Sequence, residues 1–571
     1  MKQGGGKKSI KTYLPLLATL QHYQIAWLRH DVLAGISACI VMIPSVIAYA
    51  ELVHLPPITG LYAALAASVG YALFASSRHV IAGPDAAIGL LAGSAILPLA
   101  AGDPARTAAL AALLALLAGA TLVLAGKLKL GIIADLLSRP VLIGYLNGAS
   151  LVLISTQLGK MFAIKTQGEE FFPLIGTVIE QLPNTHMPTF YFGVFLVTLL
   201  VAIGRWLTKL PGALVASAVA IAASYFFDLG RYGIALVGEV PSGMPAFSMP
   251  LPGWSDVAAL APAAVAIAFL AFSDGILLAQ TFAEKNGYDV NPNQELAALG
   301  SSNILAALWQ GFPVSASQSR TSIVDAAGGK TQVAQLVAAA GLLVFLIALT
   351  GLIALLPKVA LGAILIVTAV GMLEAGSLRK LYKIDRNEFS IAIGVTLTIL
   401  IAGVVPGIIT GLLLSLIAVL VEISRPRDAV LRRVIRDGKF HDCTEEDVAE
   451  DVAGILVYRL YAPLIFANAR FVMARIRQLV EDAGPELKWL VIDAQAITDM
   501  DVTAAQRFAE LHRELAERGV MVKIADAPRP FREELGKVGL SASLGSQQFF
   551  VSVKKAVEAF EQEQRSASET E

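Results

Sequence analysis

The stretch Pro313-Val-Ser-Ala-Ser-Gln-Ser-Arg-Thr-Ser-Ile-Val324 is a short polar segment between long apolar runs. Its arginine, Arg320, is predicted to lie at membrane depth, where a charge is costly and usually marks a substrate pathway. Serines and a threonine surround it, and the glycine pair Gly328-Gly329 follows closely. This composition is typical of a discontinuous helix whose first turn faces a cavity and binds an anion. The alternative is an arginine in a re-entrant loop that pairs with a carboxylate to fix the packing.

The composition of the whole chain indicates a polytopic membrane protein followed by a soluble domain. Of its 571 residues 56% are hydrophobic and 16% are charged, and the mean hydropathy is +0.66. A soluble protein of this size does not need so much apolar surface. Charges are sparse over 31–423 and dense over 425–571. The net charge of −1 suggests no nucleic-acid partner, and Cys39 and Cys443 fall in different domains, which argues against a disulfide framework or a thiolate metal site.

Fourteen apolar stretches are predicted to span the membrane. They are 31–50, 58–75, 84–98, 105–125, 132–158, 190–207, 211–227, 256–283, 296–311, 315–327, 332–355, 359–375, 387–403 and 406–424. The third, from Pro84, and the tenth, from Ser315, are too short for a helix of about 20 residues. Because they occupy equivalent places in two sets of seven, we expect an inverted repeat with two half-helices.

Basic residues set the predicted orientation. Residues 1–30 are expected to be a cytoplasmic segment and no cleavable signal peptide, because no apolar core precedes Asp31. Basic residues also recur in the connections between even- and odd-numbered spans: Arg78, Lys127, Lys129, Arg205, Lys209, Lys285, Lys330, Arg379, Lys380, Lys383 and Arg386. The positive-inside rule therefore predicts a multi-pass protein of the cell (inner) membrane of a prokaryote, with both termini cytoplasmic.

Six motifs together carry a resemblance to one family. They are Pro44-Ser-Val-Ile-Ala-Tyr-Ala50, Pro56-Pro-Ile-Thr-Gly-Leu-Tyr62, Ser77-Arg-His-Val-Ile-Ala-Gly-Pro84, Lys285-Asn-Gly-Tyr288, Asn293-Gln-Glu-Leu296, and Ser319-Arg320 with Gly328-Gly-Lys-Thr-Gln332. From about Leu33 to Leu540 the chain closely resembles the SulP (solute carrier 26) anion transporters. The resemblance implies a seven-plus-seven inverted repeat, in which a core bundle (spans 1–4 and 8–11) moves against a gate bundle (spans 5–7 and 12–14). It also implies a C-terminal STAS domain.

The predicted anion site lies between the starts of the third and tenth spans. The third span opens with Gly83-Pro-Asp-Ala-Ala87, in which proline favours a first helical turn and glycine permits the break before it. If the two helix starts face each other, each adds roughly +0.5 charge and free N–H groups, and Arg320 adds a full charge. Ala86, Ala87 and Arg320 are therefore predicted to bind the substrate.

The resemblance adds three residues to this site. It implies that Ser45, Tyr49 and Ser319 also lie at the substrate, where Ser45 could donate a hydrogen bond and Tyr49 could form a wall with a polar tip. The alternative for Tyr49 is a packing role. Some relatives carry an amide where this chain has Ser45, so the resemblance does not specify the selectivity of the pocket.

Asp274, in Ala271-Phe-Ser-Asp-Gly-Ile-Leu-Leu278, is the candidate ion-coupling residue. Counted back from Lys285-Asn-Gly-Tyr288, it matches the carboxylate that proton- or sodium-coupled relatives use. Sodium-using relatives offer a hydroxyl where this chain has Leu278, which favours protons over sodium. The alternative is a structural pair of Asp274 with Arg320. Asp85 is a second acidic candidate, and the sequence offers no account of it.

The soluble region is predicted to be an α/β domain. Strands are expected over 454–458, 487–493 and 520–525 and helices over 471–481 and 503–518. The predicted boundaries are a transmembrane domain at 31–424, a linker at 425–452, the STAS domain at 453–563 and a disordered tail at 564–571.

Two loop motifs resemble a phosphorylation site and a phosphate-binding loop. In Ile497-Thr-Asp-Met-Asp-Val-Thr-Ala504 phosphorylatable relatives carry serine where Val502 stands, so phosphorylation at that position is not expected; capping by Asp501 or Thr503 is the structural alternative. Gly328-Gly-Lys-Thr331 lacks the spaced glycines and the preceding strand of a phosphate-binding loop.

These observations predict a secondary transporter of a small anion and no enzyme or cofactor. We expect sulfate, bicarbonate or a dicarboxylate to move with a proton, by an elevator-like movement of a homodimer in the lipid bilayer. A sodium-coupled symporter, an uncoupled exchanger or channel, and a signalling scaffold led by the STAS domain remain as alternatives. Asp274 argues against a channel, which needs no titratable group there, and Val502 argues against the scaffold.

Overall fold

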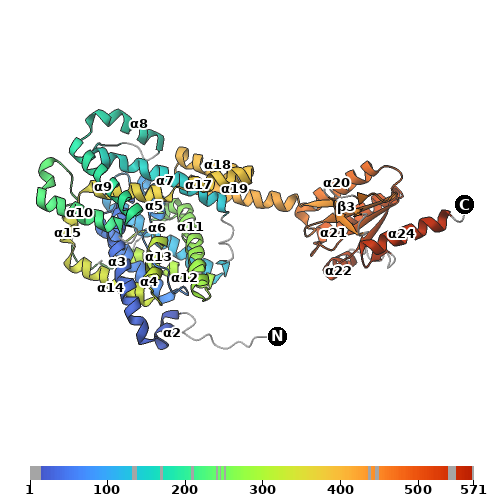
Figure 1. Ribbon diagram of the computed structural model, residues 1–571, viewed down its shortest axis with the longest axis horizontal. Helices are drawn as coiled ribbons and strands as arrows, with labels where there is room; N and C mark the ends of the chain where they lie inside the picture. The colour runs from blue at the N-terminus through green and yellow to red at the C-terminus, as the bar shows by residue number, and fades with distance from the viewer. Residues whose placement is uncertain are drawn as a thin grey trace. The chain divides into compact units, whose positions relative to one another are not determined.

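The computed structural model describes residues 14–131, 138–166, 171–207, 211–238, 242–244, 246–249, 253–434, 439–443, 449–537 and 548–568. The chain divides into two compact units, Met1–Ser415 and Leu416–Glu571. In its described part the first unit consists of helices and one short ribbon, and the second is an α/β domain (Figure 1).

The first unit contains a helix over each of the fourteen stretches for which the sequence predicts a span, and the last of these helices runs on into the second unit. The helices are α2 (Pro15–Gln21), α3 (Ile25–Leu52), α4 (Pro57–Phe74), α5 (Ala86–Ala100), α6 (Pro104–Lys127), α7 (Arg139–Phe162), α8 (Phe171–Gln181), α9 (Met187–Trp206), α10 (Gly212–Phe227), α11 (Trp254–Asn286), α12 (Pro292–Leu308), α13 (Gln318–Ala326), α14 (Val333–Ala348), α15 (Gly351–Ala354), α16 (Lys358–Met372), α17 (Ala375–Ile384), α18 (Arg386–Ala402) and α19 (Val404–Ser424). Proline stands in the first turn of α4, α6, α7, α9 and α12, where its missing N–H costs no hydrogen bond. α2, α8 and α17 lie outside the predicted spans.

These helices differ in whether they are long and apolar enough to cross a membrane. In the described part of the chain, eight segments are long and apolar enough to cross a membrane by length and composition: α3, α4, α6, α7, α9, α11, α16 with α17, and α19. Three apolar helices are shorter, namely α5, α10 and α14. The nine residues of α13 rise only about 14 Å, less than half of the hydrocarbon core. The predicted tenth span is therefore a half-helix.

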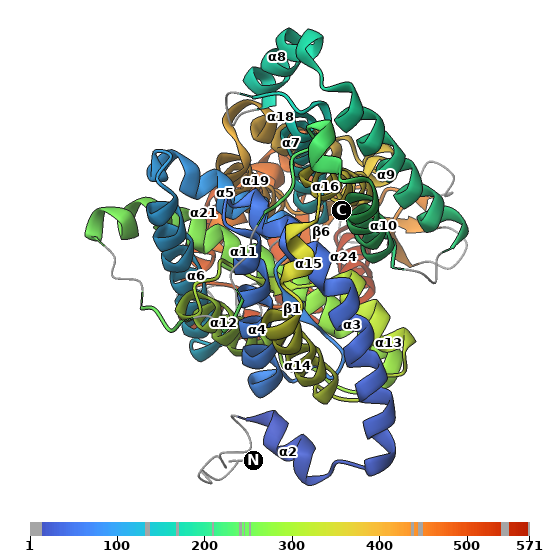
Figure 2. The same cartoon turned by 90° about the vertical axis from the view of Figure 1, so that its left-hand side faces the viewer.

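Helices α3–α6 and α11–α14 pack against one another and form the first bundle. Small residues allow its closest helix pair to approach: a Cβ added at Gly119 of α6 would lie 2.7 Å from the carbonyl oxygen of Gly300 in α12. Close backbone approach of this kind is how apolar helices associate where no hydrophobic effect drives them together. Figure 2 shows α4, α6 and α12 grouped on one side of the unit.

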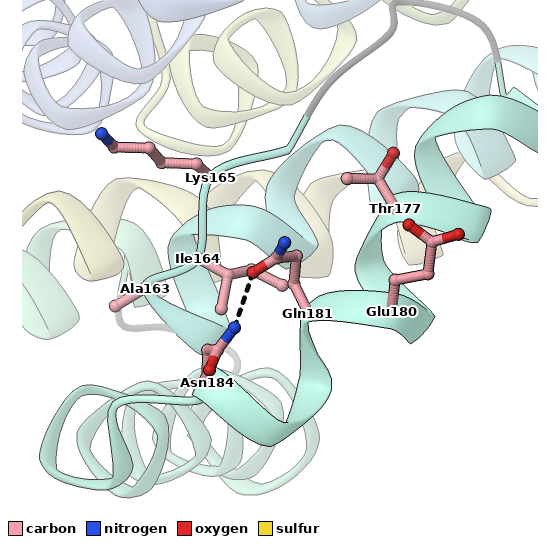
Figure 3. Close-up of a pocket in the computed structure, with 7 residues that line it drawn as sticks. All are labelled: Ala163, Ile164, Lys165, Thr177, Glu180, Gln181 and Asn184. Carbon is pink, nitrogen blue, oxygen red and sulfur yellow. Dashed lines mark hydrogen bonds between the residues drawn. The ribbon is translucent and has the colours of Figure 1, made fainter.

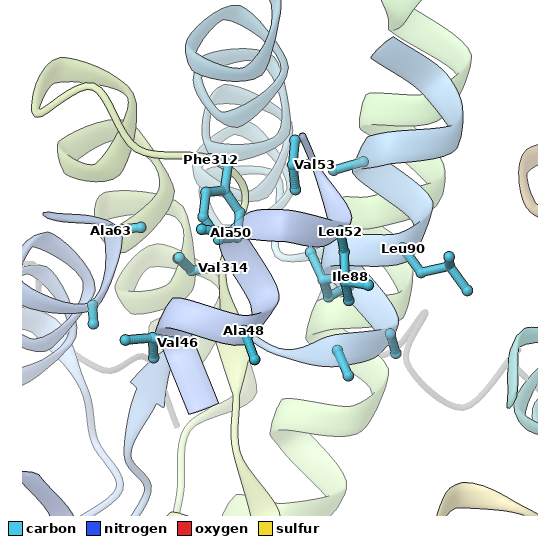
Figure 4. Close-up of a cluster of buried hydrophobic side chains, with 14 of the residues drawn as sticks. Val46, Ala48, Ala50, Leu52, Val53, Ala63, Ile88, Leu90, Phe312 and Val314 are labelled. Atoms are coloured by element: carbon cyan, nitrogen blue, oxygen red, sulfur yellow. The ribbon is translucent and has the colours of Figure 1, made fainter. Parts of the chain in front are cut away.

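Helices α7–α10 and α16–α19 form the second bundle. In Figure 2, α9, α10 and α16 lie together on the side away from α6 and α12. The two bundles meet mainly through α3 and α5, which pack against α7, α10 and α16. Buried apolar side chains of α3 and α5, among them Val46, Leu52 and Ile88, belong to the same buried cluster as Phe312 and Val314, which precede α13 (Figure 4).

The second unit is a seven-stranded sheet with helices on both faces (Figure 1). Its strands are β3 (Asp428–Val434), β4 (Phe440–Asp442), β5 (Ala449–Glu450), β6 (Ile455–Leu460), β7 (Trp489–Asp493), β8 (Met521–Ala525) and β9 (Phe549–Phe550). The order is β4-β3-β6-β7-β8-β9, with β5 paired to β3; β6 to β9 run parallel and β3 runs antiparallel to β6.

Helices α20 (Phe466–Ala483), α21 (Val502–Glu517) and α22 (Arg529–Lys537) bury one face of this sheet, and α24 (Val553–Ser568) buries the other. The predicted α/β domain is therefore present, and its predicted strands and helices lie within a few residues of β6, β7, β8, α20 and α21.

Two predicted boundaries of this domain are wrong. The range 425–452, predicted as a linker, contains β3, whose residues Asp428 to Val430 pair with Tyr458 to Leu460 of β6. Charged residues in β3 mask its strand pattern, because it lies towards the edge of the sheet and exposes part of one face. The predicted disordered tail begins inside α24, which runs to Ser568; residues 569–571 lie outside the described residues.

Candidate anion-binding site

A two-stranded antiparallel ribbon brings the starts of α5 and α13 together. β1 (Ala82–Gly83) pairs with β2 (Ser315–Ala316), with Gly83 opposite Ser315. α5 begins just after β1, and α13 begins just after β2. Because each helix directly follows its strand, each has its N-terminal end nearest the ribbon. The predicted meeting of two helix starts is therefore present.

Side chains of the first bundle anchor this ribbon. Asn303 of α12 donates to the Val314 carbonyl oxygen at 3.0 Å and accepts from the Val314 N–H at 3.0 Å. Gln335 of α14 donates to the Ala82 carbonyl oxygen at 3.1 Å. Backbone groups that a helix would satisfy internally are thus satisfied by neighbouring helices, as an irregular segment at membrane depth requires.

Arg320 lies in the first turn of α13 and is only 2% exposed. Its Nη2 donates to the Pro84 carbonyl oxygen at 2.7 Å, across the ribbon. Its Nε and Nη1 are buried and have no hydrogen-bond partner. No ion pair of Arg320 is present in the described part of the chain, so the alternative of a carboxylate-paired arginine is not what the geometry shows. Two unsatisfied guanidinium nitrogens are costly unless a ligand binds them.

The absence of a side chain at Gly83 leaves space for the Arg320 guanidinium. A Cβ added at Gly83 would lie 3.3 Å from both Nη1 and Nη2 of Arg320. This separation is tighter than most carbon contacts, so any side chain here would displace the guanidinium. The glycine that the sequence analysis assigned to the helix break therefore also shapes the site.

The start of α13 keeps its N–H groups available. Ser317 is the N-cap residue but makes no capping hydrogen bond to the backbone, and its Oγ lies 3.4 Å from that of Ser319. Ser319 is exposed, whereas Thr321 is buried and accepts from the Ile81 N–H at 3.0 Å. An uncapped helix start beside an unsatisfied guanidinium is a combination suited to an anion.

The start of α5 is capped instead. Asp85 is its N-cap residue and accepts from the Ala87 N–H at 3.0 Å. Ala86 and Ala87 are buried there, and Tyr145 of α7 donates to the Ala87 carbonyl oxygen at 3.1 Å. Tyr145 was not predicted, because nothing in its local sequence sets it apart from other aromatic residues in spans.

Ser45 and Tyr49 reach the site from α3. The Ser45 hydroxyl donates to the Val41 carbonyl oxygen of its own helix at 3.1 Å, so its proton is already used. Tyr49 interacts electrostatically with Arg320 and Asp85, and its hydroxyl lies beside Thr368 of α16. The structure thus places Tyr49 near Arg320, and it adds Thr368 from the second bundle, which the sequence analysis missed.

Asp274 lies midway along α11 and is partly buried. It has no hydrogen bond or ion pair within the described residues, so the alternative of a structural pair with Arg320 is not seen. Its electrostatic neighbours are Asp85 and Tyr145, whereas the acidic residue that interacts with Arg320 is Asp85. The structure therefore places two carboxyl groups near the site.

Three of the motifs that carry the resemblance hold the first bundle together away from this site. The buried Glu295 accepts from the backbone N–H groups of Ser76 and Ser77, both at 2.8 Å, and from the Tyr71 hydroxyl. Tyr288 and His79 stack with ring centres 5.6 Å apart, and the His79 ring nitrogens meet the Tyr288 hydroxyl and the Gly329 carbonyl oxygen. Burial lowers the pKa of His79, which keeps the ring neutral and able both to donate and to accept.

The segment Gly328-Gly-Lys-Thr331 is anchored by a carboxylate of the protein itself. Asp31 accepts from the Lys330 N–H at 2.6 Å, from the Thr331 N–H at 3.1 Å and from the Thr331 hydroxyl at 2.6 Å. An acidic side chain thus stands where a phosphate would have to bind, and the rejection of a phosphate-binding loop agrees with this geometry.

A cavity of about 410 Å³ lies elsewhere, between the end of α7 and the helix α8. Figure 3 shows its lining, in which Asn184 donates to Gln181 at 2.8 Å. Lys165 and Glu180 bring opposite charges to this open surface hollow, which lacks the buried cation of the site at Arg320.

Discontinuous helices whose N-terminal ends meet at a site inside a helical bundle are typical of secondary membrane transporters. The sulfate permease family matches residues 28–395, and the STAS domain matches residues 448–556. The chain belongs to the sulfate permease family, also called the SulP or solute carrier 26 family, and carries a STAS domain.

Relatives from bacteria, plants and animals are similar along most of the chain. A probable sulfate transporter of Mycobacterium tuberculosis is 37% identical over 96% of this chain and 98% of its own. The chloroplastic sulfate transporter 4.1 of Arabidopsis thaliana is 26% identical over 96% of this chain and 82% of its own. Solute carrier family 26 member 6 of Homo sapiens is 32% identical over 82% of this chain and 65% of its own.

Solved structures share the fold. The murine solute carrier 26 family member A9 anion transporter, in its inward-facing state, matches with a TM-score of 0.88 at 23% identity, over 97% of this chain and 95% of its own. The transmembrane domain of a cyanobacterium bicarbonate transporter matches with a TM-score of 0.59 at 21% identity, over 69% of this chain and 98% of its own.

In the STAS domain, Asp501 caps α21. It accepts from the Ala504 N–H at 2.8 Å and from the Phe466 N–H at 2.6 Å, and so joins the starts of α21 and α20. Val502 is 53% exposed and offers no hydroxyl. The structural reading of this loop, helix capping, matches the geometry, with Asp501 and not Thr503 as the cap.

Proposed function

We propose that the protein is a proton-coupled symporter of a small anion. The observation that carries this proposal is the buried guanidinium of Arg320, whose Nε and Nη1 have no partner and which lies at the uncapped start of α13. An anion of one or two charges bound there would satisfy these nitrogens and the first N–H groups of the helix.

Sulfate, bicarbonate or a dicarboxylate would suit such a site, because each presents oxygens that accept from a planar guanidinium. The names of relatives support this range, since several are called sulfate transporters and one structural neighbour is a bicarbonate transporter. In the bound state we assign Ser319 and Arg320 to direct contact. Ser45, Tyr49, Ala86 and Ala87 form the surrounding wall, with Thr368 facing Tyr49.

Proton coupling follows from the charges around this site. Asp85 and Asp274 are both near the place where the anion would bind, and a negative carboxylate there opposes a second negative charge. A proton on Asp274 removes that repulsion. Proton and anion then bind cooperatively, and each tightens the other by the same factor. Asp274 is the coupling residue in this proposal because it has no hydrogen bond or ion pair among the described residues, whereas Asp85 caps α5.

The two bundles supply the movement. We assign α3–α6 and α11–α14 to a core that carries the site, and α7–α10 and α16–α19 to a gate, as in an elevator. The Tyr49 hydroxyl of α3 lies beside Thr368 of α16. Side-chain hydrogen bonds also join the bundles from Tyr145 to the Ala87 carbonyl oxygen and from Lys160 of α7 to Glu51 of α3. Both lie on the face that α3 and α5 present to α7, so that a sliding core would break and remake few bonds.

The same proposal includes fourteen spans in two inverted halves, with β1 and β2 at equivalent places. Both termini would be cytoplasmic, in the inner membrane of a prokaryotic cell. The STAS domain would serve dimer formation or regulation and not phosphorylation at position 502, and we propose a homodimer. A sodium-coupled symporter and an uncoupled exchanger or channel are the alternatives.

Uptake into liposomes tests this function. We would reconstitute the wild type, Asp274→Asn and the control Asp256→Asn, which changes a carboxylate near the start of the same helix. Labelled sulfate, bicarbonate and dicarboxylates would be offered, with the outside pH stepped from neutral to mildly acidic, with and without sodium. The wild type and Asp256→Asn should accumulate one of these anions when the outside is acidified. Asp274→Asn should bind that anion and equilibrate it, but should not accumulate it.

Three outcomes would contradict the proposal. Accumulation that follows sodium and ignores the pH step would establish the sodium-coupled alternative. Equilibration without accumulation by the wild type would establish an exchanger or channel. Full pH-driven accumulation by Asp274→Asn would remove Asp274 from the coupling step and leave Asp85 as the next residue to change.

A further inference from the structure

Helix α17 presents a compact basic surface. Arg379, Lys380 and Lys383 are all exposed on its ten residues, and Arg386 is exposed at the start of α18. Residues 379 and 383 are one helical turn apart, and residue 380 lies beside them. Three cations therefore gather on one side of α17, and Arg386 follows at the start of α18. We call these four residues the α17 basic face.

The opposite side of α17 is fixed to the second bundle. Leu381 is buried with Ile143 of α7 and Ala392 of α18, and Leu378 and Phe389 pack against the same cluster. Figure 1 shows α17 beside α7 and α18. Because the apolar side is held by these contacts, the basic face is held in the opposite direction.

The cations of the basic face are not neutralised by a carboxylate among the described residues. In the described part of the chain none of Arg379, Lys380, Lys383 and Arg386 is in an ion pair; Arg386 lies over the Tyr382 ring at 5.9 Å. Two nearby carboxylates are otherwise engaged, since Glu374 accepts from Ser377 and Asp385 accepts from the N–H groups of Asn387 and Glu388. The third nearby carboxylate, that of Glu388, is exposed.

Apolar side chains border the basic face on both sides. Tyr382 is 53% exposed and Ile384 is 81% exposed. At 100° per residue these two positions flank the basic face. In water these apolar side chains gain no free energy from burial. At a bilayer surface, the ring and the aliphatic chain can reach the boundary between headgroups and acyl chains, while the cations contact the phosphates. α17 is the last part of a segment, Lys358–Ile384, that is long and apolar enough to cross a membrane, and so it lies at the end of that segment.

We propose that the α17 basic face binds the phosphate headgroups of anionic phospholipids and so anchors the second bundle to the membrane surface. The charge of the face matches an anionic lipid, and its apolar borders match the acyl boundary, which a free phosphate or a nucleic acid would leave exposed to water. The anchored bundle would remain in place while the first bundle moves. Lipid binding itself does not depend on which anion is transported.

Native mass spectrometry of the full-length protein in detergent tests this binding. Phosphatidylglycerol or phosphatidylcholine would be titrated against the wild type and the triple variant Arg379→Gln, Lys380→Gln, Lys383→Gln. The control is Lys537→Gln, Lys554→Gln, Lys555→Gln, which removes the same charge from the STAS domain. Each basic residue near an anionic surface strengthens binding about fivefold, so the triple variant should lose phosphatidylglycerol affinity on the order of 100-fold. The control should retain wild-type affinity, and phosphatidylcholine should not distinguish the three proteins.

A second variant separates lipid from free phosphate. Tyr382→Ser with Ile384→Ser keeps every charge, and it should also weaken phosphatidylglycerol binding several-fold. Equal loss in the control, or unchanged affinity in the triple variant, would overturn the proposal. Complete displacement of the lipid by millimolar inorganic phosphate, with no effect of Tyr382→Ser and Ile384→Ser, would show a free-anion surface and would also overturn it. None of these outcomes alters the uptake assay that tests transport.

Discussion

The starts of α5 and α13 face the same ribbon and differ in chemistry. α5 begins at Ala86, after Pro84, and is capped by Asp85, whose carboxylate accepts from the Ala87 N–H. α13 has no side-chain cap, and it contributes the buried cation Arg320. A carboxylate at a helix start takes the place of an anion, whereas an uncapped start with an unsatisfied guanidinium invites one. Two helix ends in equivalent places therefore do not make two equal anion sites: the attraction comes from α13, and α5 limits it.

The largest effect is expected from Arg320→Ala. It removes the cation and the hydrogen bond to the Pro84 carbonyl oxygen, and loss of one buried charged partner costs about 2–5 kcal/mol, or more than tenfold in affinity. Anion binding to the purified protein would be measured by titration calorimetry, with circular dichroism to check the fold. Arg78→Ala is the control, because Arg78 is an exposed cation stacked on Tyr288. Wild-type affinity in a folded Arg320→Ala protein would remove α13 as the source of attraction.

The second largest effect is expected from Asp85→Asn, which should strengthen anion binding. Asparagine caps a helix about as well as aspartate, so Asp85→Asn changes the charge and keeps the cap. If the carboxylate limits binding, its loss should tighten anion affinity about fivefold, which corresponds to about 1 kcal/mol of repulsion. Asp103→Asn, at the cap of α6, is the matched control, because Asp103 accepts from the Ala105 N–H at 2.9 Å in the same way. Unchanged or weaker affinity in Asp85→Asn would mean that the start of α5 does not oppose the anion.

A smaller effect is expected from Gly83→Ala. The added methyl group would lie 3.3 Å from two guanidinium nitrogens, so Arg320 would shift by a few tenths of an ångström. Displaced donors lose part of their hydrogen-bond energy, and we expect anion affinity to fall about threefold, which corresponds to about 0.6 kcal/mol. Gly176→Ala in α8, where nothing lies within 4 Å of an added Cβ, should change nothing. Equal affinities in these two variants would show that the guanidinium tolerates the displacement.

The smallest effect is expected from Tyr145→Phe. It removes the hydrogen bond from α7 to the Ala87 carbonyl oxygen, which is worth about 0.5–1.5 kcal/mol, and leaves the charges at both helix starts unchanged. Anion affinity should fall less than twofold, and a change in uptake rate should exceed the change in affinity. Tyr191→Phe, an exposed tyrosine in the same bundle, is the control. A loss as large as that of Arg320→Ala would place the Tyr145 hydroxyl on the anion itself.

The local sequence determined most of the individual helices and strands of this protein. Apolar runs and prolines at helix starts predicted where the helices of the first unit lie, because helix formation in a membrane depends on apolar length and on backbone groups satisfied within the segment. The alternation of apolar strands with amphipathic helices likewise predicted the α/β domain. The serine-rich segment around Arg320 predicted a helix start with a buried cation, since that combination has few other uses in an apolar chain.

Only the tertiary structure decided which parts meet. The pairing of Gly83 with Ser315, the bond from Arg320 to Pro84 and the contact from Tyr145 to Ala87 join residues far apart in the chain. β3 could be placed in the sheet only by its pairing with β6, because its exposed charged residues hide the strand pattern. The neighbourhood of Asp274 likewise depended on packing: the sequence left a pair with Arg320 open as an alternative, and the structure places Asp85 and Tyr145 near Asp274. A sequence records the chemistry of each segment, whereas hydrogen bonds and charges act over a few ångströms and depend on which segments the fold brings together.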